Sequence, residues 1–108
     1  MQNAILYFLK ISGTINNSKQ REFQQTVQFI FNHLPAECLS HNLTLDVNIS
    51  NLYHFYSLWQ SEEALAEFKF SKEFDLLSGA FQTLGTPHET LSGKGANAQL
   101  FEFNLLDT

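Results

Sequence analysis

The stretch CLSHNLTLDVNISNLYHFYSLW, residues 38–59, predicts a β-hairpin. Apolar and polar side chains alternate from residue 38 to residue 47, which is the period of a strand with one buried face. The tetrapeptide NISN at residues 48–51 is typical of a turn, and residues 52–59 return as a strand rich in aromatic side chains. A symmetric turn at this place sets Asn42 opposite Ser57 in the ladder.

This register divides the side chains of the hairpin between two faces. The leucines of the first strand, with Tyr56 and Leu58 of the second, are expected to face the helices. The opposite face then carries Ser40, Asn42, Thr44, Tyr53, Phe55, Ser57 and Trp59. Aromatic walls with a few neutral hydrogen-bonding groups are typical of a pocket for a flat, partly polar ligand. The assignment depends on the register, because a slip of one residue inverts it.

The segments on either side of the hairpin each predict further elements. Residues 4–13 are apolar on both faces, which predicts a strand that is covered on both sides. Ser18 is expected to cap a helix that Pro35 ends, with apolar residues at helical spacing: Phe23, Val27, Ile30 and Leu34. After the hairpin, Ser61 is expected to cap a second helix that breaks near Ser71.

The last part of the chain predicts one or two short strands around a glycine-rich turn at Gly93–Asn97, which the sequence leaves open as a lid or a surface loop. The order strand, helix, strand, strand, helix, strand is that of an α+β ferredoxin-like fold, a split βαβ antiparallel sheet. Right-handed crossovers place both helices on one face of such a sheet. Residues 1–108 are expected to form this single domain.

Both faces of the predicted sheet are too apolar to stay in water. Phe55 and Trp59 project from one side of their strand, whereas Tyr56 and Leu58 project from the other. The simplest cover for the face without helices is the same face of a second copy, which closes a two-chain barrel. We therefore expect a homodimer, a dimeric α/β barrel.

Composition excludes some classes of partner. The chain of 108 residues carries 11 acidic and 6 basic residues, a formal net charge of -5, so a phosphate backbone is repelled and nucleic acid is not an expected partner. The N-terminal residues lack the features of a signal peptide, and no apolar run is long enough to span a bilayer. A cytoplasmic protein without membrane contact is expected. Cys38 is the single cysteine, which excludes an internal disulfide.

The hairpin and the helix after it resemble the antibiotic biosynthesis monooxygenase family, whose members are dimeric α/β barrels. The resemblance covers about residues 4–104 and is carried by Cys38, Trp59, Ser61, Glu63, Ala64, Leu65, Ser71 and Phe74. The family includes cofactor-free oxygenases of polycyclic phenols and quinols, haem-degrading enzymes, isomerases of small sugar phosphates and proteins with no known activity. The resemblance is specific for the fold and much less so for an activity.

Departures from the family pattern narrow the choice. Many members have a histidine where this chain has Phe68, and a glutamate where it has Ser57. The haem-degrading branch uses an asparagine on the first strand, the tryptophan that corresponds to Trp59, and a haem-ligating histidine at about Ser78. Because Trp59 alone is retained, haem degradation is disfavoured, although His88 in a nearby loop leaves it open.

Two functions remain open. The first is a cofactor-independent oxygenase of a quinol, anthrone or polyphenol, which needs no metal, flavin or haem because the ionised substrate itself reduces dioxygen. The catalytic residues are then Asn42, Ser57 and Trp59, and the substrate-binding residues are Ser40, Thr44, Tyr53 and Phe55. The second is a non-catalytic dimeric barrel that binds a small aromatic ligand or serves a structural or regulatory role.

Two questions about single side chains also stay open. Trp59 is either a wall of the pocket or a wedge that fills the core. His41 and His54 have the chemistry of general bases, but the expected register places both on the helix side, where a structural or surface role is favoured. The expected pocket therefore lacks an evident base.

Overall fold

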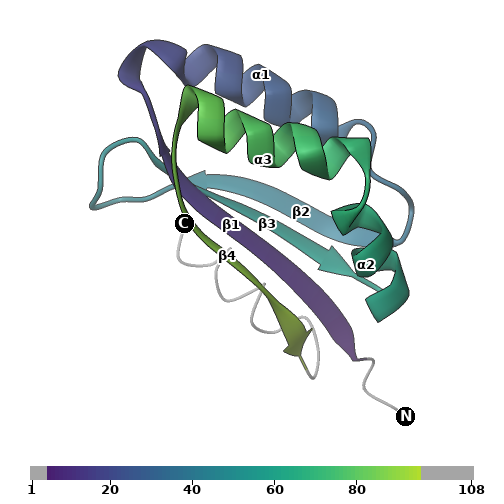
Figure 1. Cartoon of the computed structure of the whole chain (residues 1–108). Coiled ribbons are helices and arrows are strands. Elements are labelled where there is room, and N and C mark those ends of the chain that lie inside the picture. Colours follow the sequence, from purple (N-terminus) through teal and green to yellow (C-terminus); the bar gives the residue numbers. More distant parts are fainter. Residues whose placement is uncertain (1–4, 96–108) are drawn as a thin grey trace.

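A computed structural model describes residues 5–95, which form a four-stranded antiparallel sheet with helices against it (Figure 1). Along the chain the elements are β1 (Leu6–Ile15), the short 3-10 helix η1 (Asn17–Lys19), α1 (Gln20–Phe31), β2 (Cys38–Leu45), β3 (Leu52–Trp59), α2 (Glu62–Lys69), α3 (Lys72–Leu84) and β4 (Gly85–Gly95). The strands lie in the order β2-β3-β1-β4. The α+β ferredoxin-like fold predicted from the sequence is confirmed.

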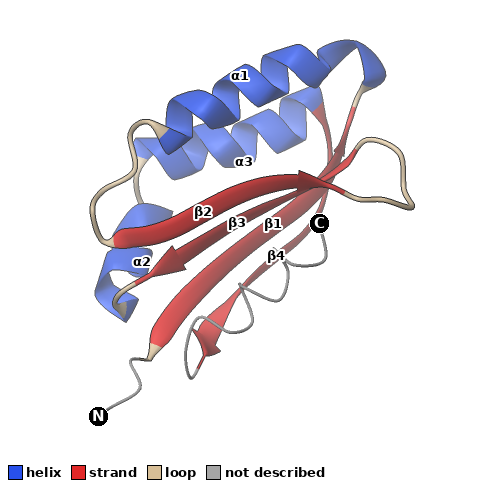
Figure 2. Ribbon diagram, turned by 180° about the vertical axis from the view of Figure 1, so that it is seen from behind, coloured by secondary structure: helices blue, strands red, loops and turns tan. Residues whose placement is uncertain are grey.

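All three α-helices lie on one face of the sheet. Helices α1 and α3 run side by side across it, and α2 lies near the end of the sheet where β3 finishes (Figures 1 and 2). Right-handed crossovers from β1 to β2 and from β3 to β4 account for this one-sided cover. Within residues 5–95 no helix lies on the other face, which we call the second face.

Helix α1 forms where the apolar spacing predicts it, but its start differs from the expectation. Phe23 and Val27 are buried against the sheet, which gives the helix its amphipathic character. Ser18 does not cap α1, because it lies within η1 and no side chain caps the helix that follows. The helix ends at Phe31, before Pro35 is reached.

Two serines start the helices that follow the hairpin. The Ser61 hydroxyl accepts a hydrogen bond from the backbone N–H of Ala64 at 3.1 Å, and Ser71 does the same for Phe74 at 3.1 Å. Each serine satisfies a backbone donor that the first turn of a helix leaves free. The expected cap at Ser61 and the expected break near Ser71 are both confirmed.

The register of the β2–β3 hairpin differs by one residue from the predicted one. Asn42 lies opposite Tyr56 rather than Ser57, and Thr44 lies opposite His54. The turn causes this shift. The Asp46 carboxylate accepts hydrogen bonds there from the backbone N–H groups of Asn48 and Ile49. This local bonding draws Val47 out of the strand, so the turn holds one more residue than NISN.

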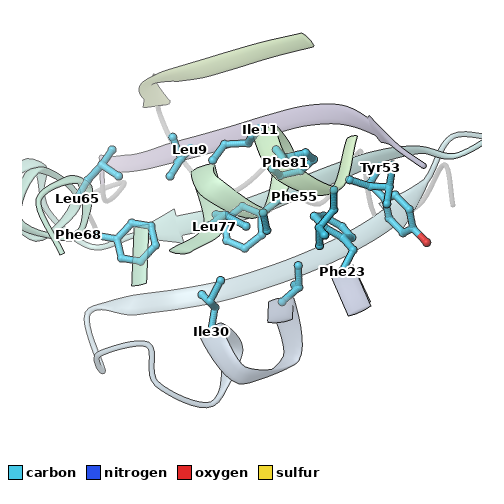
Figure 3. Packing of buried hydrophobic residues seen from close by; sticks show 14 of the residues in the cluster. Leu9, Ile11, Phe23, Ile30, Tyr53, Phe55, Leu65, Phe68, Leu77 and Phe81 are labelled. Atoms are coloured by element: carbon cyan, nitrogen blue, oxygen red, sulfur yellow. The ribbon is translucent and has the colours of Figure 1, made fainter. Parts of the chain in front are cut away.

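The register change inverts the faces of β3. Four side chains expected on the second face lie instead in the core beneath the helices, each at most 2% exposed: Tyr53, Phe55, Ser57 and Trp59. Figure 3 shows Tyr53 and Phe55 pointing toward the helices, where the ring of Phe23 lies 4.9 Å from that of Tyr53 and 4.9 Å from that of Phe81. The placement predicted for these four residues is therefore wrong.

The final strand is longer than expected. β4 runs without interruption from Gly85 to Gly95 and pairs with β1, so the turn expected to begin at Gly93 does not form there. Residues 96 and 97 of that expected turn lie outside the described residues.

Candidate functional site

Trp59 fills the core. Its indole N–H donates a hydrogen bond to the Ser57 hydroxyl at 2.8 Å, and its ring lies 4.9 Å from the ring of Phe68. Trp59 and Ser57 are both fully buried. The structure thus answers the question that the sequence left open, because the tryptophan is a wedge between β3 and α2 and does not line the second face.

The hydroxyl of Tyr53 is also satisfied on the helix side. It donates a hydrogen bond to Gln20 Oε1 at 2.5 Å and accepts one from Gln24 Nε2 at 2.8 Å. Both partners belong to α1, so Tyr53 fixes this helix to the sheet. Like Phe55, it contributes to packing beneath the helices and has no surface on the second face.

The second face is formed by the side chains that alternate with those of the core. They are Phe8, Lys10, Ser12 and Thr14 of β1, Ser40, Asn42 and Thr44 of β2, His54, Tyr56 and Leu58 of β3, and Glu89 and Leu91 of β4. Three predicted site residues, Ser40, Asn42 and Thr44, are therefore on the expected face. Their neighbours on β3 differ from those expected, because His54 and Tyr56 replace Phe55 and Ser57.

His54 is a candidate site residue that the predicted register assigned to the helix side. Its Nδ1 lies 2.8 Å from the Ser12 hydroxyl, and its Nε2 lies 3.1 Å from Asp46 Oδ1. The side chains of His54 and Asp46 are 16% and 25% exposed. The signal was present in the sequence, since His54 alternates with Phe55 along the strand, but the assumed register assigned it to the wrong face.

The Asp46 carboxylate is held in its charged form. The hydrogen bond from His54 is the main cause that lowers the pKa of Asp46, and the backbone N–H groups of Asn48 and Ile49 act in the same direction. A carboxylate accepts and does not donate, so the ring nitrogen that faces it carries the proton. His54 is thereby fixed with Nε2–H toward Asp46 and with Nδ1 accepting the Ser12 O–H.

Tyr56 gives the site an aromatic surface. Its ring lies 6.3 Å from that of His54, and Lys10 Nζ lies 5.8 Å from its centroid. Burial, with a smaller contribution from the negative charge of Asp46, raises the pKa of the Tyr56 phenol. This tyrosine therefore stays protonated near neutral pH.

The other histidines considered do not join this group. His41 remains on the helix side, as predicted, where its ring stacks on Phe31 at 4.2 Å and burial lowers its pKa. His88 lies at the exposed edge strand, with Nε2 at 3.2 Å from the Thr14 hydroxyl. Phe68 is buried at the position where many members of the family that the chain resembles have a histidine.

Among the described residues, two of the hollows on the helix side border α2. One of about 460 Å³ separates α2 from β4, where Lys69 Nζ donates a hydrogen bond to the Ser92 hydroxyl at 2.7 Å. The other, of about 300 Å³, is lined in part by His33, Glu37 and Glu67. No group of three potential metal ligands was found in residues 5–95. The second face is the stronger candidate site, because it combines aromatic side chains with an oriented imidazole.

A membrane-spanning helix is not found in the described part of the chain. None of its helices combines the length and the apolar character that crossing a bilayer requires.

Comparisons with solved structures identify the fold. A conserved protein from Methanosarcina mazei superimposes with a TM-score of 0.73 at 12% identity, over 89% of this chain and 96% of that one. A provisionally named antibiotic biosynthesis monooxygenase from Caulobacter crescentus gives 0.70 at 15% identity, over 88% and 92% of the two chains. Another, from Nitrosomonas europaea, gives 0.69 at 8%, over 88% and 91%. The resemblance inferred from the sequence is thus confirmed for the fold.

Sequence comparisons add no closer relative. No family model matches the chain, and no curated protein matches it.

Proposed function

We propose that this chain, which has the fold of the antibiotic biosynthesis monooxygenase structures, is a cofactor-independent monooxygenase of an electron-rich aromatic compound. The class of substrate is a quinol, an anthrone or a polyphenol, bound against the second face of the sheet. The observation that carries the proposal is the composition of that face, where aromatic and aliphatic side chains surround small polar groups and the oriented imidazole of His54.

The second face supplies the contacts that such a ligand needs. Phe8 and Tyr56 place partly exposed aromatic rings on this face. Asn42 lies directly opposite Tyr56 in the ladder, so its amide is next to the aromatic surface and is suited to donate to a phenolic oxygen. Donors aimed at an oxygen that becomes negative stabilise the anion more than the neutral substrate.

A second copy of the chain completes the site in this proposal. Apolar side chains occupy the second face, and two more stand exposed in the hairpin turn, with Val47 86% and Ile49 53% exposed. Apolar surface of this extent is typical of an association site. Pairing of the same face on two copies gives a closed, two-fold arrangement in which both sheets enclose the ligand.

The chemistry balances without a bound cofactor. An anthrone loses a proton to give an electron-rich anion, which transfers electrons to dioxygen and forms a carbon–oxygen bond. The resulting peroxide takes up a proton and loses water, leaving a carbonyl where the CH₂ group stood. Anthrone and O₂ thus give anthraquinone and H₂O, with one oxygen atom in each product. The protein contributes a site shielded from water, orientation and stabilisation of the anion.

A non-catalytic role remains the second candidate, and a specific observation favours it. Trp59 and Ser57 lie in the core, so two of the three side chains that the sequence suggested for catalysis are used in packing. A dimeric barrel that binds an aromatic ligand without oxidising it agrees with this placement. Haem degradation stays disfavoured on the sequence departures described above.

The decisive experiment is dioxygen uptake by the purified, metal-free protein with anthrone as substrate. Uptake above the spontaneous rate is expected, and Asn42→Ala is expected to lower it at least about tenfold, because a donor to the developing anion is lost. Gln25→Ala, on the exposed side of α1, is the control. Anthrone binding by calorimetry without uptake would support the non-catalytic candidate, whereas the absence of both would reject the site.

Light scattering tests the association of two copies. A molar mass twice that of the 12.4 kDa chain is expected. Val47→Asp, in the exposed part of the turn, is expected to shift the population toward the monomer, because it places a charge within the proposed contact. A monomer in the unmodified protein would contradict the two-chain site.

A further inference from the structure

Three side chains on the second face form a continuous hydrogen-bonded chain. Ser12 lies on β1, His54 lies opposite it on β3, and Asp46 lies just beyond the end of β2. The links are 2.8 Å from the Ser12 hydroxyl to Nδ1 and 3.1 Å from Nε2 to the carboxylate. These hydrogen bonds thus join β1, β3 and the turn that follows β2.

Backbone N–H groups fix the Asp46 carboxylate, which forms one end of this series of hydrogen bonds. Asp46 Oδ2 accepts the N–H groups of Asn48 at 2.9 Å and Ile49 at 2.8 Å, which leaves Oδ1 for the imidazole. The turn that shifts the hairpin register is therefore the same structure that holds the carboxylate against His54. An imidazole held in this way has one defined tautomer, with Nδ1 as its proton acceptor.

Both ring nitrogens of His54 are occupied within the fold. Nε2 faces Asp46 and Nδ1 faces the Ser12 hydroxyl. A proton that enters the ring from outside therefore has one direct route, through the oxygen of Ser12. That oxygen has lone pairs left to accept a hydrogen bond while its own proton is directed at Nδ1.

We propose that Ser12, His54 and Asp46 form a proton relay that ionises a phenolic ligand on the second face. The inference rests on the proposed function, because it assigns the base for the same substrate class. The ligand O–H bond breaks as its proton passes to Ser12 Oγ, and the Ser12 proton passes to His54 Nδ1. A phenolate and an imidazolium result, two protons move, and no electron is transferred. Asp46 is a positioning residue that stabilises the imidazolium.

The charged and titratable groups around the relay come from every neighbouring strand. On β3 the Tyr56 phenol stays protonated, and on β1 the Lys10 ammonium lies over the Tyr56 ring, where its positive charge favours a phenolate. On β4 Glu89 lies opposite Ser12 and adds a negative charge to this part of the sheet. His88 contacts Thr14, one step further along β1 on this face.

The same three residue types occur in acyl-transfer enzymes, but the position of Ser12 argues against a nucleophile. Ser12 lies on a strand that is paired with β3 on one side and β4 on the other. Backbone N–H groups of such a strand point along the sheet and not toward a carbonyl above it. Within residues 5–95 the paired backbone around Ser12 therefore supplies no N–H donors for an oxyanion hole, whereas a proton relay requires none.

The test uses 4-nitrophenol as the ligand, because its phenolate absorbs visible light and its ionisation can be read without any oxygenation. Binding to the full chain is measured by calorimetry, and the ionised fraction of bound probe is followed by absorbance as the pH is lowered. The unmodified protein is expected to keep the probe ionised to lower pH than His54→Gln or Asp46→Asn, by about tenfold or more in the ionisation constant for His54→Gln. His88→Gln, a histidine outside the relay, is the matched control.

Variants at Ser12 test the route. Ser12→Ala is expected to behave like His54→Gln, and Ser12→Thr, which keeps the hydroxyl, is expected to restore ionisation. Circular dichroism confirms that each variant is folded. Equal ionisation of bound probe in the unmodified protein and His54→Gln would overturn the relay while leaving the aromatic site intact, as would full ionisation in Ser12→Ala. A His54-dependent shift without anthrone oxidation would support the relay and reject the oxygenase. Absence of probe binding would overturn both.

Discussion

The indole N–H of Trp59 is bonded to the hydroxyl of Ser57, two residues earlier on the same strand, in a part of the core that solvent does not reach. The pair explains why a polar side chain is tolerated beneath the helices, since each group satisfies the other. It also removes both residues from the second face. The tryptophan that most clearly carries the family resemblance thus serves the fold, and the chemistry must be sought on the opposite side of the sheet.

Replacement of this tryptophan is expected to affect stability. Trp59→Phe removes buried ring area and leaves the Ser57 hydroxyl without its donor, so the free energy of unfolding should fall by about 1–3 kcal/mol. Urea denaturation followed by circular dichroism measures the change. Trp59→Phe combined with Ser57→Ala removes both partners and is expected to cost little more than Trp59→Phe. An unchanged unfolding free energy in Trp59→Phe would contradict the core assignment.

The fold could be predicted because its signals are periodic and repeated. Strand β3 was predicted with its observed bounds, and so were the cap at Ser61 and the helix break near Ser71. The start of α1 could not be predicted in the same way, because Ser18 has the chemistry of a cap but lies in a short 3-10 turn. The ability of a serine to cap a helix does not reveal whether the chain forms a 3-10 turn or the first turn of an α-helix there.

The candidate site could be predicted only in part, and a single residue explains why. Ser40, Asn42 and Thr44 were assigned to the correct face from alternation within β2 alone. The facing residues of β3 depended on the turn, where the Asp46 side chain bonds two backbone N–H groups and lengthens the loop by one residue. This one-residue shift in register exchanges the faces of β3, so the predicted site did not include His54.

Cross-linking tests the register directly. In a Cys38→Ala background, Asn42→Cys with Tyr56→Cys should form an intrachain disulfide on mild oxidation, because these residues lie opposite each other on one face. Asn42→Cys with Ser57→Cys is the matched control and should remain reduced, since its side chains point to opposite faces. Mass spectrometry after thiol alkylation counts the free cysteines. Preferential cross-linking of the control pair would instead support the symmetric turn predicted from the sequence, in which Asn42 lies opposite Ser57.

Two glycines are expected to respond to alanine with opposite signs. Gly79 lies within α3, and a Cβ there meets no atom within 4 Å, so Gly79→Ala should raise the free energy of unfolding by about 0.5–1 kcal/mol. At Gly85 a Cβ would lie 1.9 Å from the carbonyl oxygen of Thr14, so Gly85→Ala should destabilise the fold by about 1–3 kcal/mol. Thermal unfolding measures the stability change of each variant. If Gly85→Ala were no less stable than Gly79→Ala, the close approach of β4 to β1 would be contradicted.

Cys38 is expected to be a poorly reactive thiol in the folded protein. Burial raises the pKa of Cys38 to about 11, so little thiolate is present at neutral pH. Alkylation by iodoacetamide at about pH 8 should be at least roughly ten times slower in the folded than in the urea-unfolded protein. Mass spectrometry over time gives both rates. Equal rates would show that the thiol is accessible and ionised as in an unfolded chain.

Asp46 links stability to pH with a definite sign. The pKa of this carboxyl is lowered in the folded state, chiefly by the hydrogen bond from His54, so the folded protein binds fewer protons there than the unfolded chain. The stabilisation is fully present above the pKa of the unfolded chain and is lost as the pH falls through the lower, folded value. Asp46→Asn should therefore be less stable than the unmodified protein above about pH 5, and this difference should shrink as the pH falls to about 2.

Urea denaturation of both proteins across this range measures the difference, and Glu67→Gln on α2 controls for the loss of one negative charge. The pH dependence of this stability difference separates two explanations of how Asp46 stabilises the hairpin turn. If Asp46 acts through its charge, the difference between the proteins follows the titration of the carboxyl. If it acts only as a hydrogen-bond acceptor for the turn, asparagine replaces it and the difference stays small at every pH. A difference that grew as the pH fell would contradict the ionic link between Asp46 and His54 on which the relay depends.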